Sequence, residues 1–268
     1  MKIGIIQLCS KLDPSENLAK IEKFLKVAVD HGAKAVFLPE CFYSLSNGKS
    51  PTPYLVEEGN DHFIRIQKLA IDHGISLLGG SAATKTDHGI TNKVYNFRGD
   101  GTSLASYEKM HLFAIDLKAE SEKKVINESD IYTPGKSTSI FEFEGFTIGQ
   151  GICFDIRFSE MYRYYFQQGC NLLTASAAFT IPTGKAHWHT LLRARAIENQ
   201  SYVVASAQWG DNNENISTYG HSLVIDPWGR VLLDLEQGEK IEFVDLSLDL
   251  VKEVRSTMVV TPDLKFLK

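Results

Sequence analysis

Four side chains of reactive types lie in separate short stretches of this 268-residue chain. Cys153 lies in GQGICFDIRFSE, between small or apolar residues and charged ones, and Glu40 ends the apolar run FLPE. Lys109 lies in YEKMHLF, and Glu128 lies in the polar segment VINESD. A thiol is nucleophilic only as a thiolate, so Cys153 needs a base or a cation beside it. A glutamate can be that base, and a lysine can stabilise the charge that develops on a carbonyl oxygen.

Each of these residues also has an ordinary structural explanation. A cysteine after a strand is commonly a small packing residue, and Glu40 can simply begin a partly exposed loop. A lysine at a strand end often packs its stem and keeps its charge in water, and Glu128 can be a solvated side chain. A carboxylate at the end of an apolar strand is costly unless it is paired, so Glu40 most needs a partner. The residue types alone leave both interpretations open.

The composition favours a globular protein and argues against several classes of partner. The chain is 43% hydrophobic and 23% charged, with a net charge of −5. This balance argues against nucleic acid or an anionic membrane as a partner, because both select for basic surfaces. The N-terminal apolar run is too short for a secretion signal, and no stretch approaches the roughly 20 apolar residues that span a bilayer. The four cysteines lie far apart without a C-x-x-C motif, so we expect reduced thiols and a cytoplasmic location.

Hydrophobic periodicity predicts helices that alternate with strands, and hence an α/β fold. The predicted helices cover residues 15–32, 61–74, 159–169 and 186–200, and the predicted single strands cover 33–40, 75–82, 171–178, 201–208 and 240–248. Three hairpins are predicted, over 93–109 with a turn at 99–101, over 139–154 with a turn at 144–145, and over 221–235 with a turn at 226–229. No linker rich in proline or serine interrupts the chain. The pattern therefore predicts one domain, 1–268, with two packed sheets and helices outside them.

Four segments together resemble the signature segments of the nitrilase superfamily of carbon–nitrogen hydrolases. They are FLPE, YEKMHLF, GICFDIRFSE and ASAAFTIPTGKAHWHTLLRARAIENQ, in the order and at the spacing of that family. The resemblance runs from IGIIQL to at least VIDPWGRV. Departures are few: Ala114 stands where the family often has aspartate, and Phe154 and Ser159 stand where tyrosine and proline are common. None of these positions is a reacting group.

The resemblance implies a four-layer α-β-β-α sandwich and a catalytic set of Glu40, Lys109 and Cys153. It also matches the family's additional active-site glutamate to Glu128, ahead of the P-G turn in NESDIYTPG. It implies cleavage of a small linear amide to a carboxylate and ammonia through a thioester, with water as the second substrate and no metal or cofactor. Lys109 and the backbone N–H of Phe154 are expected to hold the oxyanion.

The resemblance is strongest to the branch that hydrolyses deaminated glutathione, an α-keto amide. The close alternative is an ω-amidase that cleaves α-ketoglutaramate, which shares the TGxAHW segment. Two other classes stay open: a catalytically silent binding protein of the same fold, and a glycosidase that uses Glu40 and Glu128 as a carboxylate pair. The glycosidase interpretation leaves Cys153 and Lys109 without a role.

The remaining expectations concern the surroundings of the site and the assembly. The pocket wall is expected to include Phe179, His187 and Trp188. His187 and His189 lie two residues apart on a predicted helix and so face different sides, which makes them poor joint metal ligands. Asp155 and Arg157 are expected to pair with each other, and strand alternation is expected to aim Cys41 away from the pocket. A homodimer is expected, with a contact through the aromatic helix 159–169, although those aromatics can also cover the chain's own sheet.

Overall fold

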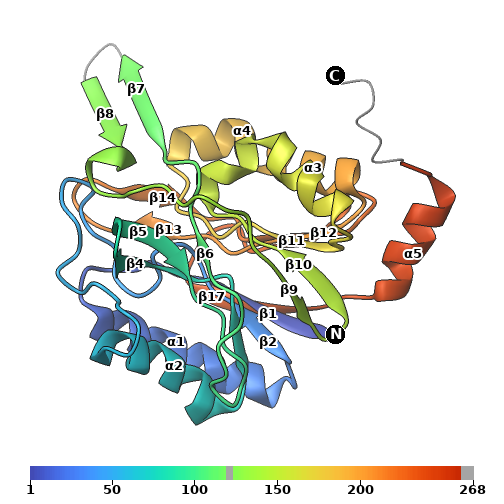
Figure 1. Ribbon diagram of the computed structural model, residues 1–268, viewed down its shortest axis with the longest axis horizontal. Helices are drawn as coiled ribbons and strands as arrows, with labels where there is room; N and C mark the ends of the chain where they lie inside the picture. Colours follow the sequence, from blue (N-terminus) through green and yellow to red (C-terminus); the bar gives the residue numbers. More distant parts are fainter. Residues whose placement is uncertain (119–122, 261–268) are drawn as a thin grey trace.

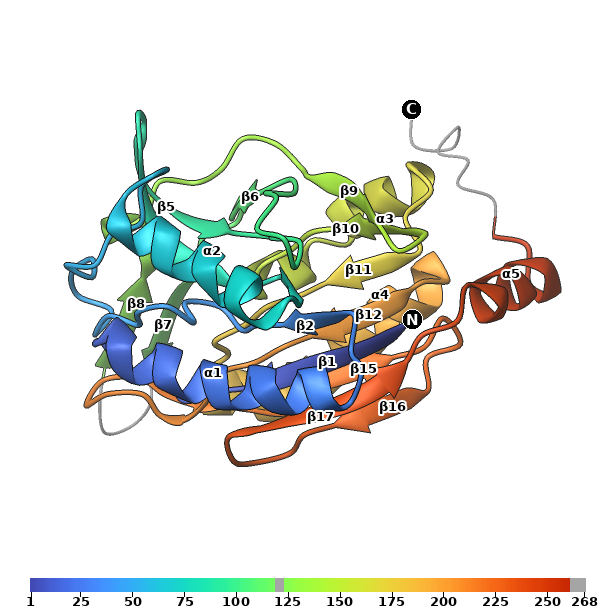
Figure 2. The same cartoon turned by 90° about the horizontal axis from the view of Figure 1, so that it is seen from below.

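The computed structural model describes residues 1–118 and 123–260, and it has four layers. Two helices cover the outer face of one sheet, two other helices cover the outer face of a second sheet, and the two sheets pack against each other (Figure 1). Turning the molecule shows α1 and α2 running across the first sheet (Figure 2). The predicted α/β fold with an α-β-β-α sandwich is confirmed.

The first sheet has four strands in the order β17-β1-β2-β3. Strands β1, β2 and β3 are parallel, and β17 is antiparallel to β1. The bounds are β1 Lys2–Gln7, β2 Ala35–Phe37, β3 Ser76–Leu78, β17 Lys240–Asp245, α1 Pro14–Asp30 and α2 Asp61–His73. Helix α1 begins one residue before the predicted start, with Asp13 as N-cap and Pro14 in the first turn. Helix α2 ends at Gly74, whose left-handed backbone closes the helix.

The second sheet has six strands in the order β16-β15-β12-β11-β10-β9. Its parallel centre is β10, β11 and β12, and β9, β15 and β16 add antiparallel neighbours. The bounds are β9 Ile140–Phe143, β10 Phe146–Gly149, β11 Leu172–Thr174, β12 Tyr202–Ala205, β15 Leu223–Ile225, β16 Val231–Asp234, α3 Ser159–Gln167 and α4 Ile181–Asn199. Helix α4 begins at Ile181 rather than at residue 186, because Pro182 is accommodated in its first turn.

The central layer of the core is formed by side chains from both sheets. Ile5 and Phe37 of the first sheet share one buried cluster with Phe143 and Val204 of the second. A second cluster joins α1 and α2 to the first sheet, and a third joins α3 and α4 to the second sheet. The central strands of each sheet are therefore buried on both faces, which explains why they are near-continuous apolar runs in the sequence.

Smaller elements surround the ends of these strands. They are β4 Ser81–Thr86, β5 Gly89–Val94, β6 Tyr107–Glu108, β7 Ala114–Lys118, β8 Lys123–Asn127, β13 Trp209–Asp211, β14 Ser217–Tyr219, α5 Leu248–Thr257, and 3₁₀ turns at Glu128–Asp130 and Cys153–Arg157. The predicted hairpin over 93–109 forms: β5 pairs with β6 at Lys93–Glu108 and Val94–Tyr107, a Phe97–Ser103 bridge continues the pairing, and the turn lies at 99–101. Strand β4 pairs with the other edge of β5, which the sequence did not predict. The other two predicted hairpins form with their predicted turns. No helix in the described ranges is long and apolar enough to cross a membrane.

Candidate active site

The site lies where chain segments leave the carboxyl ends of strands in both sheets. Glu40 follows β2, Cys153 follows β10, and Ala178 follows β11. Because β10 and β11 are parallel, their carboxyl ends meet at one edge of the sheet, and the Ile152–Ser176 bridge extends this pairing beyond the strands. Ligands of α/β sheets commonly bind at such an edge.

Lys109 carries its ammonium group between two glutamates. Nζ of Lys109 is 2.9 Å from Oε1 of Glu40 and 2.7 Å from Oε2 of Glu128. The lysine side chain is fully buried, whereas Glu128 retains some exposure. The lysine backbone is also held, because its N–H donates to the Asn92 carbonyl and its carbonyl accepts from Gly135. A Cβ on Gly135 would collide with the Glu108 carbonyl, so this close approach requires glycine.

Glu40 has hydrogen-bond donors on both carboxylate oxygens. Oε1 accepts from Lys109 and from the Asn92 side chain at 2.8 Å, and Oε2 accepts from the Ala178 backbone N–H at 2.7 Å. The same Ala178 N–H acts to lower the pKa of the Cys153 thiol. Glu40 and Cys153 therefore share a neighbour, which places the carboxylate close to the thiol.

Cys153 lies in a strained turn beyond the carboxyl end of β10. Its φ of +48° is uncommon for a residue other than glycine, and such conformations are concentrated at functional sites. Its backbone N–H donates to the Ser176 carbonyl at 2.7 Å. Burial raises the pKa of the Cys153 thiol well above its usual value, and the Glu40 charge raises it further, against the opposing effect of Lys109. The resting thiol is therefore protonated at neutral pH and needs a base.

The same charges act on the other members of the group. Burial alone would lower the pKa of Lys109, but Glu128 and Glu40 raise it well above its usual value, so the ammonium stays charged. Burial raises the pKa of Glu128, and Lys109 opposes that shift. The Phe113 backbone N–H donates to Glu128 at 2.7 Å, which fixes the second carboxylate relative to the YEKMHLF segment.

Asp155 ties the Cys153 turn to the segment that carries Lys109. Its buried carboxylate accepts from the Tyr107 hydroxyl at 2.8 Å, from the backbone N–H of Ile152 at 2.9 Å, and from His111. The expected pairing of Asp155 with Arg157 is wrong, because these partners already occupy the carboxylate and the short 3₁₀ turn points the arginine elsewhere. Asp155 is a positioning residue that the sequence interpretation missed.

A cavity of about 290 Å³ opens over these groups. Its lining includes Glu40, Glu128 and Cys153 together with Phe113, Tyr132, Phe154, Arg157, Phe179, Thr183 and Ile216. Cys41 also lines the cavity, as does Tyr132, so the expectation that it points away is wrong. Strand β2 ends at Phe37 and Cys41 has φ +52°, so strand alternation does not extend that far. The lining is mostly apolar with a few convergent polar groups, as is usual for small-molecule sites.

Two of the four expected pocket residues line the cavity. Phe154 and Phe179 do, whereas His187 and Trp188 do not. Trp188 is fully buried and packs against Phe179 with ring centroids 4.6 Å apart, so it supports the wall from behind. His187 contacts the Arg157 guanidinium at 3.2 Å.

Arg157 and Lys49 are both cations of the cavity lining, and the sequence interpretation gave neither a role in binding substrate. The Arg157 guanidinium lies over the rings of Phe154 and Phe179, each 5.5 Å from the ring centroid. Its Nε is buried and has no hydrogen-bond partner among the described residues. A guanidinium with free donors in an apolar pocket fits a carboxylate or phosphate oxygen. The segment DIR, which follows Phe154 with one acidic and one basic residue, was the available signal.

The comparison with known proteins decides the family. The carbon–nitrogen hydrolase family model matches residues 2–256. The chain belongs to this family. It is a hydrolase that acts on carbon–nitrogen bonds other than peptide bonds, with a small-molecule amide and water as substrates.

The relatives of this carbon–nitrogen hydrolase are named for two different amidase activities. The chain is 36% identical to omega-amidase NIT2 of Homo sapiens, over 97% of this chain and 93% of that protein. It is 35% identical to the deaminated glutathione amidase of Dictyostelium discoideum, over 97% and 92%. Its structure is similar to Saccharomyces cerevisiae Nit3, a member of branch 10 of the nitrilase superfamily, with a TM-score of 0.84, 28% identity, and coverage of 97% and 95%.

We expect Asp155→Asn to lower kcat more than it raises KM. The substitution would weaken the link between the segment that carries Lys109 and the turn that carries Cys153, and Asp155 does not line the cavity. The asparagine amide would present N–H donors to the donors now bound there, at a cost of about 1–3 kcal/mol of folding free energy. Urea denaturation and steady-state kinetics measure both effects. Asp72→Asn, which breaks an exposed pair with Lys68, is the control and should change neither. An unchanged kcat in the folded Asp155→Asn variant would contradict the positioning role.

Proposed function

We propose that this protein hydrolyses the linear amide of deaminated glutathione through a thioester on Cys153, with α-ketoglutaramate as the second candidate. The observation that carries the proposal is one cavity lined by Glu40, Glu128 and Cys153, with the buried Lys109 held between the two glutamates. The deaminated glutathione amidase relative supports the first substrate, and the omega-amidases support the second. Both substrates have the same α-ketoglutaryl acyl half, so both would form the same thioester.

In the proposed mechanism Glu40 takes the thiol proton while Sγ of Cys153 attacks the amide carbon. The oxyanion is stabilised by Lys109 and by the backbone N–H of Phe154, which lies at the start of a 3₁₀ turn where N–H groups lack intrahelical partners. Glu40 returns the proton to the leaving nitrogen, and the amine departs. Glu40 then activates a water molecule that hydrolyses the thioester, and Glu128 keeps Lys109 in place. This chemistry needs no metal or cofactor.

The leaving amine differs between the two candidates. Hydrolysis of α-ketoglutaramate releases ammonia, whereas deaminated glutathione releases the cysteinylglycine dipeptide. Production of the shared keto acid therefore reports on both substrates, and ammonia reports on only one. The choice between them depends on how the cavity receives the leaving group, since the acyl half is common.

Two alternatives fit the geometry less well. A glycosidase needs both carboxylates free to face a sugar, but Glu40 and Glu128 both contact Lys109. A silent binding protein has no need for a strained cysteine beside a carboxylate and an ammonium. Neither alternative gives the buried lysine a role.

Cys153→Ala should abolish formation of the keto acid from both candidate substrates, a loss of about 10⁴-fold or more in kcat. Iodoacetamide should inactivate the native enzyme with one label on Cys153. Cys170→Ala is the matched control, because Cys170 is a buried thiol outside the cavity, and it should retain activity and labelling. Full turnover by the Cys153→Ala variant would end the proposal.

We further propose that Arg157 binds the carboxylate of the α-keto acyl group. Arg157→Gln should raise KM for α-ketoglutaramate about 10- to 100-fold, as expected for loss of a hydrogen bond to a charged group. A neutral amide of similar size that lacks the carboxylate is the matched substrate, and its kcat/KM should change little. An equal loss for both amides would show that Arg157 only shapes the pocket.

We infer a cytoplasmic homodimer built from single-domain subunits of residues 1–268. The match over residues 2–256 supports one domain, and the four free cysteines suit a reducing compartment. The net charge of −5 supports the absence of nucleic-acid and anionic-membrane partners. In helix α3, Met161, Tyr162 and Tyr165 cover the chain's own sheet, and Tyr164 remains 41% exposed for a contact.

Tyr164→Glu should weaken self-association, because it places a charge in the proposed contact. Light scattering after size-exclusion chromatography measures the mass, and Lys68→Glu on exposed α2 is the control. A monomeric native protein would refute the dimer, and a dimer that persists in the Tyr164→Glu variant would place the contact elsewhere.

A further inference from the structure

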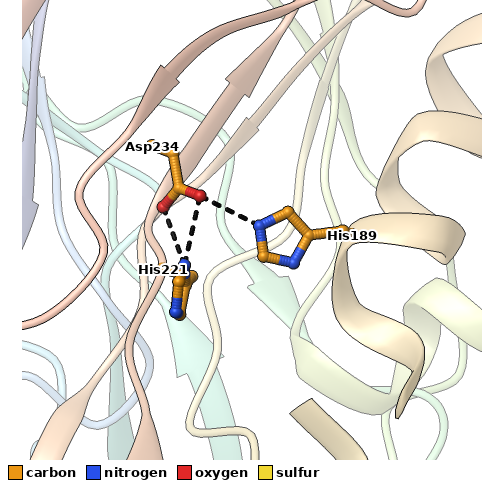
Figure 3. A group of neighbouring side chains, drawn as sticks. All are labelled: His189, His221 and Asp234. Atoms are coloured by element: carbon orange, nitrogen blue, oxygen red, sulfur yellow. Dashed lines mark hydrogen bonds and ion pairs between the residues drawn. The ribbon is translucent and has the colours of Figure 1, made fainter. Parts of the chain in front are cut away.

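A second cluster of reactive side chains lies outside the cavity. Among the described residues, His189, His221 and Asp234 are grouped as a metal-binding set would be, with one ligand atom from each within 4.8 Å of the others. Nε2 of His189 is 3.0 Å from Oδ2 of Asp234, and Nδ1 of His221 is 2.9 Å from Oδ1 and 3.1 Å from Oδ2 (Figure 3). The amidase mechanism uses none of these residues.

The three side chains come from separate segments that meet at the edge of the second sheet. His189 lies on α4, Asp234 ends β16, and His221 precedes β15 (Figures 2 and 3). All three are only partly buried, with side chains 36%, 27% and 19% exposed in the order His189, Asp234, His221. An ion from solvent can therefore reach the cluster without any rearrangement of the core.

The backbone fixes the position of His221 before any ligand arrives. Its N–H donates to the Glu236 carbonyl at 2.8 Å, and its carbonyl accepts from Nε1 of Trp188 at 2.8 Å. The Tyr219 ring stacks on the His221 ring at 4.4 Å, and the Glu236 N–H holds Oδ1 of Asp234 at 2.8 Å. Precise metal sites depend on this kind of support around the ligands.

We propose that His189, His221 and Asp234 bind a divalent transition-metal ion of the zinc class. Two imidazole nitrogens and one carboxylate oxygen are ligands that Zn²⁺ takes, with water completing the coordination. Separations of 2.9 and 3.0 Å between each imidazole nitrogen and its nearest Asp234 oxygen fit a metal with bonds near 2.0–2.1 Å. In the metal-bound state each histidine carries its proton on the ring nitrogen away from Asp234, so that a lone pair faces the ion.

The competing explanation is a hydrogen-bonded clamp without metal. In that case each histidine donates its proton to Asp234, and the cluster simply fastens α4 to the edge strand. The two explanations differ in one measurable respect. A metal that binds only the folded chain raises its melting temperature as the metal concentration rises, whereas a clamp gives no such dependence.

The test is titration of the untagged Cys153→Ala protein with Zn²⁺ by isothermal calorimetry, because that background removes the catalytic thiol as a ligand. We expect one-to-one binding, and a rise in melting temperature with added Zn²⁺. Co²⁺ in the same site should give the visible absorption of nitrogen and oxygen ligation without a thiolate charge-transfer band. None of these measurements depends on amidase activity, so failure here leaves the proposed function untouched.

Variants assign the binding to the three residues. In the same background, His189→Ala and Asp234→Asn should each lose the one-to-one isotherm and the zinc-dependent rise in melting temperature. His187→Ala is the matched control on the same helix and should keep both. Circular dichroism without zinc confirms that each variant is folded, and His221→Ala replaces any that is not. Absence of one-to-one binding in the parent, or binding unchanged by His189→Ala and Asp234→Asn, would overturn the proposal.

Discussion

Lys109 places its ammonium group in the interior, where it contacts Glu40 and Glu128 and no solvent. Removing one member of such a buried group leaves an uncompensated charge, at a cost of about 3–5 kcal/mol. The three segments that carry these residues must therefore converge for the fold to be stable. Folding and assembly of the site are thus one event, because the charges that would catalyse the reaction also hold the segments together.

The same charges determine how the thiol can react. Burial is the main reason that the pKa of the Cys153 thiol is raised, Glu40 and Glu128 raise it further, and Lys109 opposes them. A free thiolate is consequently disfavoured in the resting site. In the proposed mechanism, attack on a carbonyl carbon is therefore coupled to proton transfer to Glu40, the carboxylate whose charge acts most strongly on the Cys153 thiol. Lys109 stays protonated throughout and can act only as a charge.

Much of this arrangement could be predicted from the sequence, and the failures share a physical cause. The resemblance correctly implied that four residues converge: Glu40, Lys109, Glu128 and Cys153. The strands and helices that carry them could be predicted because apolar periodicity and helix caps are local patterns. The errors at Cys41 and at the Asp155–Arg157 pair both concern turns after strands, where a positive φ or a 3₁₀ turn breaks strand alternation. Asn92 was missed because its contacts with Glu40 and Lys109 span 52 and 17 residues of sequence, and no local pattern encodes them.

Two histidines of α4, His187 and His189, contact two different groups of residues. His187 faces Arg157 at the cavity, whereas His189 faces Asp234 at the edge of the second sheet. Residues two apart on a helix point in different directions, so the segment AHWH separates these contacts rather than combining them. Trp188 between them packs behind Phe179 and donates to the His221 carbonyl, so it touches the wall of the cavity and the backbone of the second cluster. A shift of α4 would therefore change the contacts of both the cavity wall and the second cluster, because the Trp188 indole contacts Phe179 and the His221 backbone.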